Sequence, residues 1–235
     1  MLDISHLQIL HEDNHLIAVN KPGGWLVQGD ETGDTPLSEY VKTYIKIRYK
    51  KPGEVFLGVI HRLDRPVSGV VVFARTSKAL SRMNKLFQDR KIEKTYWAIT
   101  VNRPEPINGR LEHYILKDRS RNVSRVFDKI GKRTQDAKKG VLDYQLMAQL
   151  EGKCLLQVNP ITGRPHQIRV QLASMGCPII GDLKYGFPRA NRDATIHLHC
   201  RELSFVHPVK KEPVQIRATP PEDQVWNSFQ HLYGE

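Results

Sequence analysis

The sequence predicts a single mixed α/β domain, of the α+β kind, over residues 1–235. Short apolar runs bounded by glycine, proline and asparagine recur along the chain, which is the pattern of strands and turns. A few segments instead repeat apolar residues at intervals of three and four, which is typical of helices with one buried face. No internal repeat or low-complexity linker interrupts these patterns. We therefore expect one sheet that is flanked by helices and loops.

The elements follow from local patterns. Strands are expected at Gln8–His11, Leu16–Val19, Glu93–Val101, Val141–Gln149, Lys153–Val158, His197–Phe205 and Val214–Arg217. Helices are expected after Thr35-Pro36, from Thr76-Ser77 to about Asp89, from Pro165 to Ala173 and after Pro221. Thr35 and Thr76 are residues that cap helix N-termini, and proline is favoured in a first helical turn. Glu151-Gly152 predicts the turn of a hairpin.

The charge of the chain favours a polyanionic partner. The sequence has 36 Lys and Arg against 25 Asp and Glu, a formal net charge of +11. Nucleic acid is the expected partner of such a protein, although charge by itself is weak evidence. A membrane surface is the competing partner, but no basic helix has the broad apolar face that this would require.

The cysteines and the N-terminus predict a cytoplasmic protein. Cys154, Cys177 and Cys200 are far apart and odd in number, so they predict neither a disulfide framework nor a zinc site. No apolar run has the length of a membrane span, and the first residues lack the features of a signal peptide. His197, His199 and His207 suggest a metal site only weakly, because no carboxylate or cysteine completes a ligand set.

Asp64 is the central candidate for chemistry. It lies in a polar segment between two apolar runs, and Pro66 and Ser68-Gly69 close that segment, so strand, loop, strand is expected. Arg62 and Arg65 flank Asp64, and nearby cations favour the ionised carboxylate. Asp64 is therefore expected to act as a nucleophile or base. A turn residue paired with a local arginine is the competing interpretation, and it is the more common one for an isolated aspartate.

Four motifs, in order, resemble the RluA-type pseudouridine synthases, which isomerise uridine within RNA. The motifs are Val19–Gly24, His61–Asp64 followed by Ser68-Gly69, Glu93–Ala98, and Thr162–Arg169 followed by Gly176–Asp182 and Tyr185-Gly186. They span nearly the whole chain. The departure is Val67, where many relatives have threonine, and it affects a loop contact more than the chemistry. The resemblance implies a mixed, mostly antiparallel sheet.

The resemblance also implies the roles of site residues. Asp64 is then the catalytic residue, and Arg62 occupies the space that the extruded uracil leaves. Tyr96 lies against the target base. Arg169 pairs with Asp64. Independently of the resemblance, the start of the predicted helix with Arg164 and Arg169 is suited to bind an anion, either an RNA phosphate or the Asp64 carboxylate, although an exposed basic helix end would explain Arg164 alone. The isomerisation involves no redox step, so no cofactor and no metal is expected.

Several alternatives stay open. Asp64 could attack the sugar C1′, attack the base C6 or remove the C2′ proton. An N-glycosidase would release free uracil and would need a second carboxylate, and a non-catalytic RNA-binding module would not need Asp64. The RNA is expected to be ribosomal or transfer RNA, with no DNA or membrane partner, and the protein is expected to be a monomer.

The RNA affinity is expected to come from the catalytic domain. Many relatives have a small separate RNA-binding domain before it, but here the opening strand of the family begins almost at once. Residues 117–139 predict a long, mobile, basic connection around a short strand near Val126-Phe127. Its basic residues are Arg119, Arg121, Arg125, Lys132, Arg133, Lys138 and Lys139.

Overall fold

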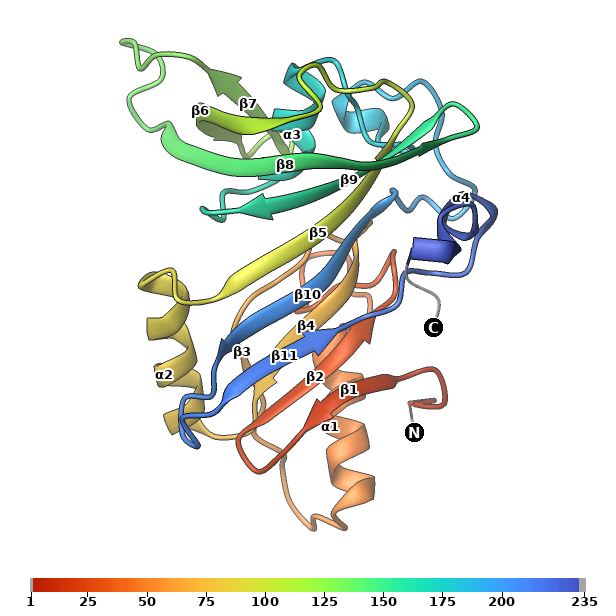
Figure 1. Ribbon diagram of the computed structural model, residues 1–235. Helices are drawn as coiled ribbons and strands as arrows, with labels where there is room; N and C mark the ends of the chain where they lie inside the picture. Colours follow the sequence, from red (N-terminus) through yellow and green to blue (C-terminus); the bar gives the residue numbers. More distant parts are fainter. Residues whose placement is uncertain (1, 233–235) are drawn as a thin grey trace. The chain divides into compact units, whose positions relative to one another are not determined.

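The computed structural model describes residues 2–232 (Figure 1), and within them the chain divides into two compact units. Unit 1 contains the chain up to Glu93 together with Cys200–Pro220. Unit 2 contains Lys94–His199 together with the segment that begins at Pro221. Each unit is therefore built from segments that are distant in sequence. The assignment of residues 1–235 to one domain stays a prediction.

Unit 1 is built on antiparallel strands. Its strands follow the order β1 (Gln8–Glu12), β2 (Leu16–Lys21), β4 (Ser68–Ala74) and β10 (Leu198–Val206). The strand β11 (Pro213–Arg217) pairs with β10, and the short β3 (Gly58–Val59) pairs with β4. Every residue of β4 is buried, as expected for a strand in the middle of a sheet.

Two helices complete unit 1. The helix α2 (Ser77–Gln88) packs against β3 and β4 (Figure 1), and the Thr76 side chain accepts a hydrogen bond from the Ala79 N–H, so the predicted cap is confirmed. The prediction that Thr35 caps the first helix is wrong. Helix α1 (Leu37–Arg48) has Pro36 at its N-cap, without a side-chain cap, because Pro36 has an extended backbone and the helix starts after it.

Unit 2 contains the longest strands. Their order is β5 (Glu93–Thr100), β9 (Lys153–Pro160), β8 (Lys138–Leu150), β6 (Asn108–Asp118) and β7 (Val123–Phe127). The register of these neighbours is antiparallel throughout. The predicted hairpin that turns at Glu151-Gly152 is confirmed. The antiparallel fold class with few helices is confirmed as well.

The basic segment differs from its prediction. It is not one long connection, because β7 pairs along its whole length with the end of β6 and Lys138 and Lys139 begin β8. The strand β6 was not predicted, because its residues alternate only weakly between buried and exposed positions. What remains irregular is the turn 119–122 and the connection 128–137, where the basic side chains are exposed.

The other helices are shorter than predicted. Helix α3 (Gln167–Ser174) starts two residues after Pro165, because His166 has a left-handed backbone conformation, with φ 54° and ψ 22°. After Pro221, α4 covers only Gln224–Asn227. Even so, α4 contributes Trp226 to a hydrophobic core of unit 2. The other members of this core are Trp97, Ile99, Leu155, Ile180 and Phe229. Burial of this apolar surface stabilises unit 2.

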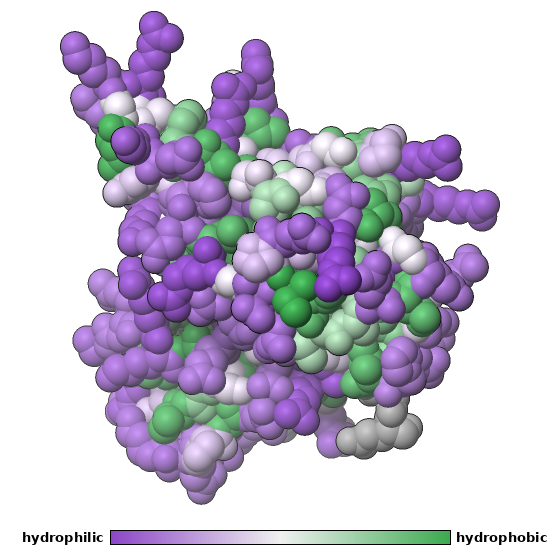
Figure 2. Space-filling view, turned by 45° about the horizontal axis from the view of Figure 1, so that its top comes forward, coloured by the Kyte–Doolittle hydropathy of each residue, from purple (hydrophilic) through white to green (hydrophobic). Residues whose placement is uncertain are grey.

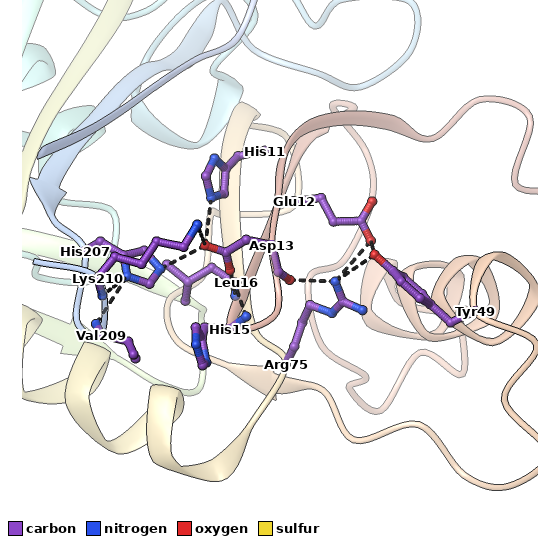
Figure 3. Close-up of polar contacts among 10 residues, drawn as sticks. All are labelled: His11, Glu12, Asp13, His15, Leu16, Tyr49, Arg75, His207, Val209 and Lys210. Atoms are coloured by element: carbon purple, nitrogen blue, oxygen red, sulfur yellow. Dashed lines mark hydrogen bonds and ion pairs between the residues drawn. The ribbon is translucent and has the colours of Figure 1, made fainter. Parts of the chain in front are cut away.

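Figure 3 shows how the turn after β1 is fixed to the turn after β10 in unit 1. Asp13 Oδ1 accepts hydrogen bonds from the backbone N–H groups of His15 and Leu16, at 2.7 and 2.8 Å. Asp13 Oδ2 lies 3.1 Å from His207 Nε2 and 3.2 Å from Lys210 Nζ. Because His207 Nδ1 accepts two backbone N–H groups, its proton is on Nε2 and faces Asp13.

Between residues 2 and 232, no helix is long and apolar enough to cross a membrane, and no group of three histidine, cysteine or acidic side chains could hold a metal ion. Hydrophilic residues dominate the face drawn in Figure 2, where hydrophobic residues are scattered.

Candidate active site

The Asp64 loop, defined here as residues 60–67, joins β3 to β4 in unit 1. Within this loop, Leu63 and Val67 are buried, one before and one after Asp64, while the Asp64 side chain is partly exposed. The Val67 N–H donates to the Asp64 carbonyl oxygen at 3.0 Å, which closes a tight turn. The predicted strand-loop-strand arrangement is therefore confirmed, although Ser68 and Gly69 already belong to β4.

A second turn of unit 1, residues 22–25, holds the Asp64 loop through Arg65. The Arg65 carbonyl oxygen accepts a hydrogen bond from the Gly24 N–H at 2.8 Å, and Arg65 Nε donates to the Gly24 carbonyl oxygen at 3.0 Å. Arg65 Nη2 also forms an ion pair with Asp34 at 2.7 Å. These contacts fix the backbone that follows Asp64 and direct the Arg65 charge toward Asp34.

Lys21 is fully buried beneath this turn, at the end of β2. Its Nζ donates to three carbonyl oxygens, those of Pro22 at 2.9 Å, Trp25 at 2.8 Å and Arg65 at 3.1 Å. Burial, opposed by the Asp64 carboxylate, lowers the pKa of Lys21 to about 7. Lys21 lies in the first of the four motifs, but its burial could not be predicted, because nothing local in the sequence indicates that a lysine is buried.

The residues before Asp64 have different roles. The ring of His61 stacks on Phe87, with centroids 5.1 Å apart, and its Nε2 accepts the Val72 N–H at 3.0 Å. The Nε2 atom of His61 therefore carries no proton, and the ring supports the Asp64 loop against α2 and β4. Arg62 is exposed, so its planar guanidinium is accessible to a base from outside.

Tyr96 lies in unit 2, on β5. Alternation along β5 places it on the opposite side from Trp97 and Ile99, which belong to the core of that unit. Tyr96 is partly exposed and stands opposite Val158 of β9. The prediction that Tyr96 shares a face with Lys94 and Ala98 is consistent with this strand.

Arg169 is buried in α3 and forms a bidentate ion pair with Asp182. The distances are 2.7 Å from Nε to Oδ2 and 2.8 Å from Nη2 to Oδ1, and both side chains are buried in unit 2. The guanidinium carbon also lies 5.0 Å from the centre of the Tyr185 ring. A planar guanidinium held in this way has a fixed direction. Asp182 belongs to the fourth motif, but its pairing with Arg169 was not predicted.

The start of α3 is fixed by a buried amide. Gln167 Oε1 accepts from the Thr162 hydroxyl at 2.7 Å and from the Arg164 N–H at 2.9 Å, while its Nε2 donates to the Val141 carbonyl oxygen at 3.0 Å. Arg164 Nε donates to the Lys139 carbonyl oxygen at 2.9 Å. This contact directs Arg164 toward β8 and leaves its other guanidinium nitrogens for a phosphate.

His166 and Tyr185 connect α3 to the β6–β7 hairpin. His166 Nδ1 lies 2.7 Å from the Tyr185 hydroxyl oxygen, and His166 Nε2 lies 3.0 Å from Lys117 Nζ. The Tyr185 oxygen also accepts the Ser124 N–H at 2.7 Å. Burial raises the pKa of Tyr185, so its hydroxyl stays protonated at neutral pH. No local pattern in the sequence predicts this chain of contacts.

The predicted site residues thus fall into two groups. Arg62 and Asp64 lie on one loop of unit 1, whereas Tyr96, Arg164 and Arg169 lie in unit 2. Of the second group, Arg164 precedes α3 and Arg169 lies within it. The predicted pairing of Arg169 with Asp64 and the predicted contact of Tyr96 with the target base stay predictions.

Comparisons with known proteins show the family of the chain. A family model described as RNA pseudouridylate synthase matches residues 15–174. The tRNA pseudouridine synthase C of Vibrio cholerae is 35% identical over 246 residues, which cover 97% of this chain and 96% of that protein. The tRNA pseudouridine synthase C of Salmonella typhi is 34% identical over 246 residues, which cover 97% of this chain and 90% of that protein.

A solved structure extends the similarity to the fold. Human RNA Pseudouridylate Synthase Domain Containing 4 superposes with a TM-score of 0.77 at 27% sequence identity, covering 95% of this chain and 92% of that chain. The chain therefore belongs to the RNA pseudouridylate synthase family. It is an isomerase that acts on RNA, and the resemblance inferred from the four motifs is confirmed.

Proposed function

We propose that this protein converts a uridine of transfer RNA to pseudouridine, with Asp64 as the catalytic carboxylate. The observation that supports this most is the Asp64 loop, in which the backbone is fixed on both sides of a partly exposed carboxylate. Transfer RNA is proposed because relatives that are 35% and 34% identical over nearly the whole chain are named tRNA pseudouridine synthase C.

The reaction requires a base to leave the RNA stack. The bond between C1′ and N1 breaks, the uracil turns, C1′ bonds to C5, and the C5 proton leaves while N1 gains a proton, so the atoms balance. Extrusion of the base costs a few kcal/mol, roughly, which binding must offset. Arg62 is exposed beside Asp64 and is suited to fill the vacated space by stacking on neighbouring bases.

The carboxylate of Asp64 then acts at the sugar or at the base. Attack at C1′, attack at C6 and removal of the C2′ proton each need the same ionised group. In unit 2, Tyr96 is proposed to support the uracil, and Arg164 is proposed to bind an RNA phosphate. Arg169 is proposed to orient Asp64 through the guanidinium direction that Asp182 sets.

The exposed basic side chains of unit 2 are proposed to bind the RNA backbone. Arg119 and Arg121 lie in the β6–β7 turn, and Arg125 is exposed on β7. Each phosphate contact that is removed should reduce the slope of log affinity against log salt by about 1. A monomer that works in the cytoplasm is also proposed, and three buried cysteines that form no disulfide within residues 2–232 fit a reducing compartment.

The test uses transfer RNA labelled with tritium at uridine C5, because the reaction releases this hydrogen to water. The wild-type protein and a control variant, Asp30→Asn in an exposed loop of unit 1, should release tritium. Asp64→Asn should bind the RNA with the same affinity and release none. Release by Asp64→Asn would overturn the catalytic assignment, and release only from ribosomal RNA would overturn the substrate.

A further inference from the structure

An acidic loop of unit 1, defined here as residues 28–35, is joined to the Asp64 loop by an ion pair. All of its residues are exposed, and it precedes α1. It contains the carboxylates of Asp30, Glu31 and Asp34 and no lysine or arginine, in a chain whose formal net charge is +11. Negative charge beside the loop that is proposed to receive RNA opposes the approach of a polyanion.

The acidic loop is closed at its base and weakly held along its length. At the base, the Leu37 N–H donates to the Leu26 carbonyl oxygen at 2.7 Å. Within residues 2–232, one hydrogen bond or ion pair joins the acidic loop to another segment, and it is the 2.7 Å contact of Asp34 Oδ2 with Arg65 Nη2. The loop can therefore leave Arg65 without a change at the start of α1.

The Arg65 guanidinium is oriented independently of Asp34. Its Nε donates to the Gly24 carbonyl oxygen at 3.0 Å, which directs the side chain along the turn 22–25. The ion pair with Asp34 is open to solvent, since 47% of the Arg65 side chain and 52% of the Asp34 side chain are exposed. Such ion pairs shift an equilibrium by about fivefold or less. A phosphate, which accepts two parallel N–H groups of an arginine, binds more strongly.

The acidic loop also offers Asp34 another partner. Thr32 Oγ1 lies 2.6 Å from Asp30 Oδ1 and 3.2 Å from Asp34 Oδ2. A hydroxyl has one proton to donate, and either carboxylate is within its reach. When Asp34 leaves Arg65, its carboxylate stays in water with this hydroxyl nearby, so the separation leaves no charge buried.

We propose that Arg65 binds a backbone phosphate next to the target uridine, and that Asp34 occupies its guanidinium until the RNA displaces it. This proposal rests on the proposed action of Asp64 on that uridine. Arg65 directly follows Asp64, so their Cα atoms are about 3.8 Å apart. A carboxylate that reaches the sugar of the uridine brings the next residue close to the two phosphates that this sugar carries. Arg65 thus binds the backbone, whereas Arg62 is proposed to stack on bases.

The test is a double-mutant cycle of affinity for an unmodified transfer RNA transcript. It is carried out in the Asp64→Asn protein, so that the RNA is not converted during the measurement. Arg65→Gln should weaken binding about fivefold or more and lower the slope of log affinity against log salt by about 1, because one phosphate contact is lost. Asp34→Asn should tighten binding about two- to fivefold, because the competitor of the phosphate is removed.

The two changes should not be additive. The matched control is Glu31→Gln, which removes one charge from the same loop, because Glu31 forms no ion pair within residues 2–232. In the Arg65→Gln protein, Asp34→Asn should change the affinity no more than Glu31→Gln does. Equal tightening by Asp34→Asn with and without Arg65 would overturn the exchange, since the loop would then only repel RNA. Unchanged affinity and slope in Arg65→Gln would overturn the phosphate contact.

Arg65→Lys separates the charge of Arg65 from its contact with the turn 22–25. A lysine keeps the positive charge but loses the Nε contact with Gly24. The salt slope should therefore stay that of the parent protein, while the affinity falls because a lysine cannot bind the phosphate through two parallel N–H groups. A slope that falls as far as in Arg65→Gln would assign the effect to the turn and overturn the proposal.

The proposed function fails in a different way. If the wild-type protein releases no tritium from transfer RNA, the proposed function is wrong and the role of Arg65 falls with it. If tritium is released but the cycle shows no coupling between Arg65 and Asp34, only the exchange proposed here is wrong.

Discussion

Replacement of Gly69 by alanine should destabilise unit 1 strongly. Gly69 lies in β4, five positions after Asp64, and its φ is +116°, a conformation that residues with a Cβ rarely adopt. A Cβ at this position would lie 2.3 Å from the Cys200 carbonyl oxygen and 2.5 Å from the Cys200 nitrogen. Both atoms belong to the backbone of β10, so they cannot move aside as the end of a flexible side chain could.

The stability lost in Gly69→Ala is the sum of two separate costs. A non-glycine residue in such a conformation costs roughly 1–3 kcal/mol, and overpacking against atoms that cannot relax costs about 1–3 kcal/mol more. The sum, about 4 kcal/mol, is a large part of the 5–15 kcal/mol, roughly, that stabilises a typical domain. The variant should therefore be partly unfolded at mild urea concentrations.

The control is Gly176→Ala. Gly176 follows α3 and has a φ of +80°, but no atom lies within 4 Å of the position its Cβ would take. It should cost only about 1–2 kcal/mol, the backbone term alone. Urea unfolding followed by tryptophan fluorescence compares the two variants with the wild-type protein. Equal losses of stability would refute the reasoning, because they would mean that β10 moves away from the new methyl group without cost.

Three further variants test other contacts. Arg169→Met should lower the free energy of unfolding by about 3–5 kcal/mol, because it leaves the Asp182 carboxylate buried and unpaired. Trp226→Ala should cost about 3–5 kcal/mol in urea unfolding, since the fully buried indole is part of the core of unit 2. Burial opposes the ionisation of Asp13, but the N–H groups of its turn, with Lys210, hold its pKa well below the ordinary value. Asp13→Asn should therefore cost about 2 kcal/mol at pH 7, and this cost should shrink as the pH falls below about 4, where the unfolded wild type takes up a proton.

Each of these predictions has its own control. For Arg169, the double variant with Asp182→Leu should recover part of the lost stability, and no recovery would contradict the ion-pair explanation. For Trp226, the exposed Leu183 supplies a comparison, and Leu183→Ala should cost little. For Asp13, unfolding curves from pH 3 to pH 7 are compared with those of the wild type, and a pH-independent difference would exclude the titration of Asp13 as its cause.

The sequence by itself determined most of the elements and the place of the central residue. Apolar residues alternate or recur at helical intervals wherever one face of an element is buried, so strands such as β2 and β9 and the helix α2 could be predicted within a few residues. Pro66 and the two arginines beside Asp64 located its loop in the same way. The four motifs, in their order along the chain, indicated the family.

Other features were decided only by the tertiary structure. Local patterns do not show which distant groups meet, because a pairing depends on how the chain returns. Arg169 and Asp182 pair across thirteen positions, and the β6–β7 pairing turned a predicted connection into a hairpin. The burial of Lys21 is the clearest case. A lysine at the end of a strand is normally exposed, and this one is buried because three carbonyl oxygens from two separate turns converge on its ammonium group.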